Sequence, residues 1–176
     1  MSTLKVNALQ NTSGTALNFI KQVKQTVKTD VTSFSSSTSN TFQDISGMSV
    51  SITPTSSSSK ILVLFTANVS QSTTATIHLR LQRGSTSIFQ GDAASNRIGS
   101  TQIVRTNGTP YDYEVFPLTG SFLDSPSTTS AITYKLTGTL GGQYTGTFYL
   151  NRAKDDANAD YAGRTASSIV VMEVAG

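Results

Sequence analysis

The sequence LDSPSTTSAITYKL at residues 123–136, together with SSIVVMEV at 167–174, has the pattern of short β-strands joined by turns. Apolar side chains alternate with small polar ones, which is the two-residue period of a strand with one buried face. Thr favours strands through its stiff β-branch, whereas Ser and Pro favour turns. These stretches predict a β-sheet protein with few catalytic side chains.

Similar alternating runs recur along the chain, separated by turns rich in Ser, Thr, Gly and Pro. We expect eight or nine strands in an all-β, antiparallel, jelly-roll-like β-sandwich over residues 21–176. Residues 1–20 form a short N-terminal attachment arm, and residues 33–41 form a loop. The expected strands are 21–29, 42–53, 60–70, 75–83, 86–91, 111–124, 131–138, 144–151 and 167–174, with 102–104 as a further short candidate.

Three of these strand predictions carry more detail. The apolar run at 60–70 indicates a central strand, and the turn at 83–85 predicts a hairpin between its flanking strands. Pro117 indicates a bulge or an edge position. The expected core consists of Met48, Val50, Ile52, Ile61, Val63, Phe65, Ile77, Leu79, Leu81, Ile132, Tyr134, Leu136, Phe148, Ile169 and Val171.

The composition suits a structural or binding module better than an enzyme. Ser and Thr make up roughly 30% of the chain, and charged residues only 13%, about half the usual fraction. Surfaces with so little charge tolerate close self-association, because few ions must be desolvated. The chain has no Cys, which excludes disulfides and thiolate metal sites. We expect no cofactor.

The net charge of +3 is distributed unevenly. Residues 1–29 carry four lysines and no acid, which indicates a solvated or partner-facing arm. Nucleic-acid binding would need a denser basic patch with interleaved aromatics, so we expect none. No apolar stretch is long enough to span a membrane, and the N-terminus does not resemble a signal peptide.

His78 is the only histidine, so a serine triad or a zinc site has little to be built from. It lies on the polar face of its strand, and we expect an ordinary surface residue there. Asp155, Asp156 and Asp160 form only a weak calcium-loop pattern without its central Gly and terminal Glu. The pair Asp112 and Glu114 would lie on one strand face, but this spacing is common among strands.

Two further groups of side chains are singled out. Aromatic rings stack on the apolar faces of sugars, so exposed tyrosines are candidate glycan contacts, with buried or rim tyrosines as the alternative. The candidates are Tyr111, Tyr113, Tyr144 and Tyr149. Arginines supply planar forks of donors that can hold long loops in shape. We expect this role, with Asp92, for Arg97, Arg152 and Arg164.

The N-terminal arm holds two short apolar segments around a polar, Gly-containing turn. Such a hairpin-sized unit cannot bury its apolar side chains alone, so we expect it to dock on another copy or another protein. The expected attachment residues are Leu4, Lys5, Val6, Leu9, Leu17 and Phe19.

Several longer stretches resemble a family of short virion proteins of marine bacteriophages, especially cyanophages, described as tail-fibre-like or structural. The matching stretches are ITPTSSSSKILV, LRLQRGSTSIFQGDAASNR, FLDSPSTTSAITYKL and LNRAKDDANADYAGRTASSIVVMEV. The opening MSTLKVNALQNTSG resembles the attachment arm of such fibres. The resemblance carries no catalytic residues.

The resemblance implies a virion protein that is assembled in the host cytoplasm. We expect a tail-fibre or spike-type module that is attached through its arm and presents a homotrimeric β-sandwich to the host surface, with polysaccharide as a candidate ligand. Two alternatives stay open. One is a capsid decoration protein, and the other is a carbohydrate-binding module free of any particle.

Overall fold

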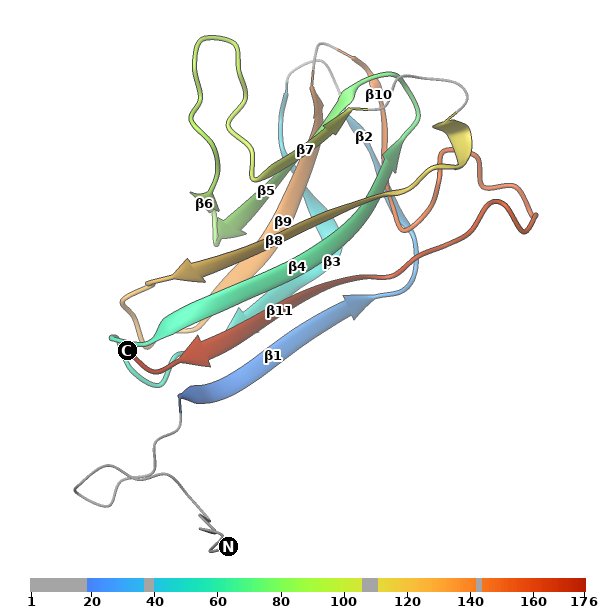
Figure 1. Cartoon of the computed structure of the whole chain (residues 1–176). Helices are drawn as coiled ribbons and strands as arrows, with labels where there is room; N and C mark the ends of the chain where they lie inside the picture. The colour runs from blue at the N-terminus through green and yellow to red at the C-terminus, as the bar shows by residue number, and fades with distance from the viewer. Residues whose placement is uncertain (1–18, 37–39, 106–110, 142–143) are drawn as a thin grey trace, which may run out of the picture.

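The computed structural model describes residues 19–36, 40–105, 111–141 and 144–176, and within them the protein is built from β-strands packed in two antiparallel sheets (Figure 1). One 3-10 turn, η1 (Tyr111–Tyr113), interrupts them. The strands are β1 (Ile20–Lys28), β2 (Thr32–Ser36), β3 (Gln43–Ile52), β4 (Lys60–Gln71), β5 (Thr76–Arg83), β6 (Thr86–Phe89), β7 (Gln102–Arg105), β8 (Phe116–Asp124), β9 (Ile132–Gly141), β10 (Gly146–Leu150) and β11 (Ser167–Val174). The predicted all-β antiparallel sandwich is confirmed.

The six-stranded sheet has the order β1-β11-β4-β10-β2, with β8 on the other side of β4. The second sheet has the order β3-β9-β5-β6, with β7 also paired to β5. As the sequence predicts, β4 is central and β5 forms a hairpin with β6. Strand β8 pairs only with β4 among the described strands, so Pro117 lies on an edge strand.

The eleven strands correspond to eight longer strands, because three of the eight are each broken into two segments. Strands β10 and β11 follow one another along the same side of β4, and β2 and β1 continue alongside them. Strands β7 and β6 likewise share one side of β5. If each broken strand is counted once and the eight are numbered along the chain, their order is 1-8-3-6 in the first sheet and 2-7-4-5 in the second, which is jelly-roll topology. The prediction of eight or nine strands listed the two halves of the last one, 144–151 and 167–174, separately and missed β2.

The Asn151 side chain makes hydrogen bonds at two of these breaks in the strands. Its side-chain amide, which is fully buried, donates to the carbonyls of Lys28 and Asp30, where β1 gives way to β2. Its side-chain oxygen accepts a hydrogen bond of 2.6 Å from the hydroxyl of Ser167, where β11 begins. The backbone of Asn151 has a φ of 64°, a region that Asn tolerates better than most residues. One side chain thus joins two breaks in neighbouring strands.

The core lies between the inner faces of the two sheets. Every residue of the predicted core is buried except Ile132, which lies at the first position of β9 and is only partly covered. Ala67, Val69, Leu140 and Leu150 complete the same layer. Because burial alternates residue by residue in β4, β5 and β11, the two-residue period identified the inward face correctly.

Two further sequence predictions are wrong in detail. Residues 33–36, which were predicted as part of a loop, belong to β2, because their backbone pairs with β10 and Phe34 stacks on Phe148 at 4.7 Å between ring centroids. The strand expected at 111–124 begins only at Phe116, and Asp112 lies in the 3-10 turn before it. Asp112 and Glu114 therefore do not share a strand face.

A buried polar group joins the sheets near one end of the core. The carboxylate of Asp124 in β8 accepts two hydrogen bonds from Arg83, at 2.8 and 3.0 Å, and one of 2.7 Å from the Tyr134 hydroxyl. Burial, followed by the bond to Asp124, raises the pKa of Tyr134. These charge-assisted bonds satisfy groups that would be costly to bury alone.

Candidate functional site

The best-organised cluster of exposed polar and aromatic side chains lies where η1 meets the loop between β10 and β11. The amide of Asp155 in that loop donates to the carbonyl of Asp112, at 2.8 Å. Figure 1 shows this loop extending beyond the sheets beside η1. Because Asn151 fixes the start of the loop, the cluster is held against the sandwich. Loops positioned by a rigid scaffold are common binding sites.

Two tyrosines form the exposed surface of this cluster. Tyr113 and Tyr161 meet edge to face, with ring centroids 4.8 Å apart and planes at 74°. Their side chains remain 44% and 59% exposed. The Tyr113 hydroxyl hydrogen-bonds to Asp155, and this bond raises the pKa of Tyr113. The pair therefore presents aromatic surface in a fixed geometry beside hydroxyl and carboxylate groups.

Ion pairs surround the tyrosines and fix the loop. Lys154 contacts Asp112 at 2.8 Å, and Arg164 makes two bonds to Asp156, at 2.7 and 3.2 Å. Arg152 also pairs with Asp156 and donates to the carbonyls of Ala153 and Lys154. The predicted loop-shaping role of Arg152 and Arg164 is consistent with this geometry. The same role for Asp92 and Arg97 stays a prediction.

The four predicted tyrosines do not gather at one place. Tyr113 lies in the cluster, and Tyr149 of β10 borders it through Arg152, whose guanidinium lies 4.4 Å from the Tyr149 ring centroid. Tyr144 is 40% exposed and precedes β10. The side chain of Tyr111 lies outside the described residues. Tyr161 was missed, because a lone tyrosine in the polar sequence ADYAG gives no signal that it will meet Tyr113.

His78 is not the ordinary surface residue that the sequence predicts. Its ring is half-buried under the loop after β6, and Nδ1 lies 2.8 Å from the Ser100 hydroxyl. A Cβ on Gly141 of β9 would lie 2.4 Å from Nε2, so this glycine leaves room for the ring. Burial, and then the charge of Arg80, lower the pKa of His78. In the described part of the chain the imidazole packs under the loop, hydrogen-bonds to Ser100 and lies near the charge of Arg80.

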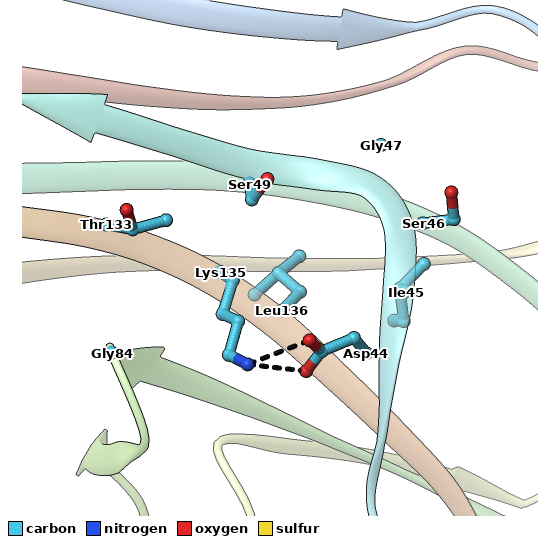
Figure 2. A pocket seen from close by; sticks show the side chains of 9 residues that line it. All are labelled: Asp44, Ile45, Ser46, Gly47, Ser49, Gly84, Thr133, Lys135 and Leu136. Carbon is cyan, nitrogen blue, oxygen red and sulfur yellow. Dashed lines mark hydrogen bonds and ion pairs between the residues drawn. The ribbon is translucent and has the colours of Figure 1, made fainter.

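A depression of about 410 Å³ opens at an irregularity in β3 (Figure 2). Four residues of β3 between Asp44 and Ser49 lie opposite the single residue Leu136 of β9. Gly47 takes a φ of 81° there, and the Lys28 side chain occupies the place that a Cβ would need. Figure 2 shows Lys135 reaching both carboxylate oxygens of Asp44, at 2.7 and 2.8 Å. The depression is a bulge closed by an ion pair, without convergent reactive groups.

Metal binding has no support within the described ranges, which contain no group of three or more His, Cys, Asp or Glu side chains able to hold an ion. Asp156 is engaged by two arginines and Asp155 by Tyr113, so these acids bind neighbouring side chains. No helix of the described residues has the length and hydrophobicity to cross a membrane.

Of the predicted attachment residues, only Phe19 is described. It is 62% exposed, and its carbonyl accepts a hydrogen bond from Ala175 beside β1. Leu4, Lys5, Val6, Leu9 and Leu17 lie outside the described residues.

Comparison with known proteins gives only distant likenesses. No family model and no curated protein matches the sequence. Solved structures of infectious bursal disease virus match in the Gt strain (TM-score 0.41, 13% identity) and in the Gx strain (TM-score 0.41, 12% identity). Each match covers 98% of this chain but only 43% and 42% of the viral chains, so this protein spans less than half of their length.

Proposed function

We propose that the protein is a structural component of a bacteriophage virion. The observation that carries the proposal is the jelly-roll order of the eight strands, 1-8-3-6 facing 2-7-4-5, in a chain with stretches that resemble phage virion proteins. Jelly rolls serve as viral capsid domains and as lectins, among other uses, so fold alone is an analogy. The low charge of the chain, which tolerates close self-association, supports a structural role.

In its finer form, the proposal is a tail-fibre or spike-type module. The segment before β1 attaches the protein to another virion component, and the sandwich forms a homotrimer that faces the host. A small polar β-module gains useful stability by burying area between copies. Trimeric repetition also multiplies a weak contact with a surface. A capsid decoration protein is the competing assignment.

Location in the particle tests this proposal. Purified virions should contain the protein by mass spectrometry, and immunogold labelling should place it on the tail. Labelling spread over the head would support decoration, and absence from virions would overturn both assignments.

Removal of the N-terminal segment separates attachment from folding. A chain beginning at Phe19 should keep the β-type circular dichroism, because β1 starts at Ile20. It should no longer associate with particles. Loss of the β-spectrum would show that the removed segment belongs to the core.

Carbohydrate binding is a second candidate function, favoured by the Tyr113–Tyr161 pair. Both rings are exposed, held in place, and adjacent to hydroxyl and carboxylate groups, as a sugar platform requires. Binding to host polysaccharide should fall at least tenfold in Tyr113→Ala or Tyr161→Ala. Tyr144→Ala is the matched control, because Tyr144 has similar exposure but is not part of the pair. Equal losses in all three variants would contradict a site at the pair.

A further inference from the structure

The outer face of the six-stranded sheet carries a continuous apolar row. The register places Val23 opposite Met172, Met172 opposite Leu62, and Leu62 opposite Leu123, so the row crosses β1, β11, β4 and β8. Figure 1 shows these four strands lying side by side. The two end members, Val23 and Leu123, are 51% and 48% exposed. The row is therefore open to solvent at both edges of the sheet.

The two rows on one side of the apolar row contain no charged side chain, whereas the row on the other side runs from Ile20 through Val174 to Lys60. Of the two uncharged rows, the nearer is half apolar and the one after it is mostly hydroxyl-bearing. Their members are Gln25, Val170, Leu64 and Ser121, followed by Val27, Ser168, Thr66 and Thr119. Covering these rows would bury apolar surface without desolvating an ion.

The orientation of β1 gives independent evidence that this face is covered. Val23 and Val27 point outward, and Val27 is 55% exposed. Gln22 and Thr26 point inward, where they donate to the carbonyls of Thr53 and Ser49. A strand at the edge of a sandwich usually buries its apolar side chains, and a register shift of one residue would exchange the two faces. In β1 the polar side chains hold the strand in the register that exposes the valines.

We propose that this outer face joins copies of the chain in the homotrimer, a proposal that rests on the trimeric function above. A second copy suits the face because the three rows that begin at Val23, Gln25 and Val27 bring no charge from either side, and Lys60 lies at their margin. Four strands and the ladder from Ile61 to Val69 span about 19 Å by 30 Å, roughly 570 Å² in projection, and in a closed ring the two neighbouring copies share this area.

Threefold symmetry determines which edges meet. A closed ring of three copies has heterologous contacts, in which one patch meets a different patch of the neighbour. The apolar row has its exposed ends on β1 and β8, the two edges of this four-strand region. The β1 end of one copy therefore lies against the β8 end of the next copy, with Val23 near Leu123 of the neighbour.

Sedimentation of the purified full chain tests the interface. The unaltered protein should sediment as three chains at micromolar concentration, and both Val23→Asp and Leu123→Asp should sediment as one chain with an unchanged β-type circular dichroism spectrum. Ile103→Asp is the matched control, because Ile103 is 59% exposed but lies in β7 of the other sheet. This control should remain trimeric.

Other outcomes overturn the inference. These are a monomeric unaltered chain, a trimer that survives both substitutions, or a trimer that Ile103→Asp dissociates. A monomer that is nevertheless found in virions would overturn the inference and leave the structural assignment intact.

If both Asp variants lose the β-type circular dichroism spectrum, disulfide cross-linking tests the interface instead. The chain has no natural cysteine, so mixed Val23→Cys and Leu123→Cys proteins should cross-link to each other more than either does to itself. Equal self-linkage and cross-linkage would contradict the arrangement.

Discussion

The outer faces of the two sheets differ, although both inner faces are largely apolar. On the second sheet most paired rows of outward residues are polar: Ser51 with Thr133, Ser49 with Lys135 and Gln82, and Asp44 with Thr137 and Arg80. Ile103, opposite His78, is an isolated apolar exception. On the six-stranded sheet the corresponding positions include the row from Val23 to Leu123. A sandwich needs only its inner faces apolar, so an apolar outer face indicates a partner.

The largest expected effect tests the difference between inner and outer positions. Leu79 is fully buried between the sheets, so Leu79→Ala should lower the free energy of unfolding by about 2–5 kcal/mol through a cavity. Leu123→Ala, on the outer face, should cost the isolated chain less than about 0.5 kcal/mol. Urea denaturation of both variants measures this, and equal costs would show that the outer row is part of the fold's own core.

Glu173 tests how the six-stranded sheet tolerates charge. This inward, fully buried carboxylate accepts bonds from Gln22, Thr55 and Ser59. Burial would raise its pKa, but these bonds outweigh burial and lower the pKa to about 2. The contribution of the Glu173 carboxylate to the free energy of unfolding is therefore fully present above about pH 4.5 and is lost as the pH falls towards 2.

Removal of this charge should have a clear cost at neutral pH. Glu173→Gln should lower the free energy of unfolding by about 1.5–3 kcal/mol at pH 7, because the charge-assisted bonds are lost. The variant should also lose less stability than the unaltered chain between pH 4.5 and pH 2. Identical pH profiles by thermal denaturation would contradict this account.

His78 tests how polar the outer face of the second sheet is. The imidazole bonds to Ser100 and is half-buried, so His78→Ala should cost about 1 kcal/mol. Because folding lowers the pKa of His78, the folded chain favours the neutral ring. The contribution of the ring to the free energy of unfolding should therefore decline as the pH falls below about 6.5. Thermal melts at pH 7.5 and pH 5.5 measure both effects. A cost below about 0.3 kcal/mol would mean that the loop does not pack on the ring.

The smallest effects concern the loop cluster beside η1, which belongs to neither outer face. Arg164→Ala should lower the melting temperature slightly more than Lys154→Ala, because Arg164 makes two bonds to Asp156 whereas Lys154 makes one to Asp112. Both pairs are partly exposed, so each cost should stay below about 1 kcal/mol. Scanning calorimetry of the two variants can detect the difference, and the reverse order would contradict it.

The sequence was informative where local period and burial coincide. Alternation identified most of the strands and about two thirds of the buried core, since inward positions must be apolar in a sandwich. It missed β2, whose Ser-rich sequence pairs through its backbone, with Phe34 as its principal apolar anchor. The hydrogen bonds by which Asn151 joins the end of β1 to the start of β11 were not predictable, because they connect residues far apart in the chain.

The candidate sites were less predictable. A tyrosine pair depends on where two loops meet, so Tyr113 was found and Tyr161 was not. The apolar outer row was also invisible in the sequence, because its members come from four strands and their alignment depends on register. In β1 the outward valines are four residues apart, a spacing that suggests a helix as readily as a strand.

Cysteine labelling tests most directly whether the two outer faces differ in the assembled protein. In the isolated chain Val23 and Ile103 are similarly exposed, 51% and 59%, so single Val23→Cys and Ile103→Cys variants should react with a maleimide at similar rates when dilute. At concentrations where the protein associates, we predict that labelling of Val23→Cys slows at least tenfold while that of Ile103→Cys is unchanged. Equal rates at every concentration would contradict a covered face on the six-stranded sheet.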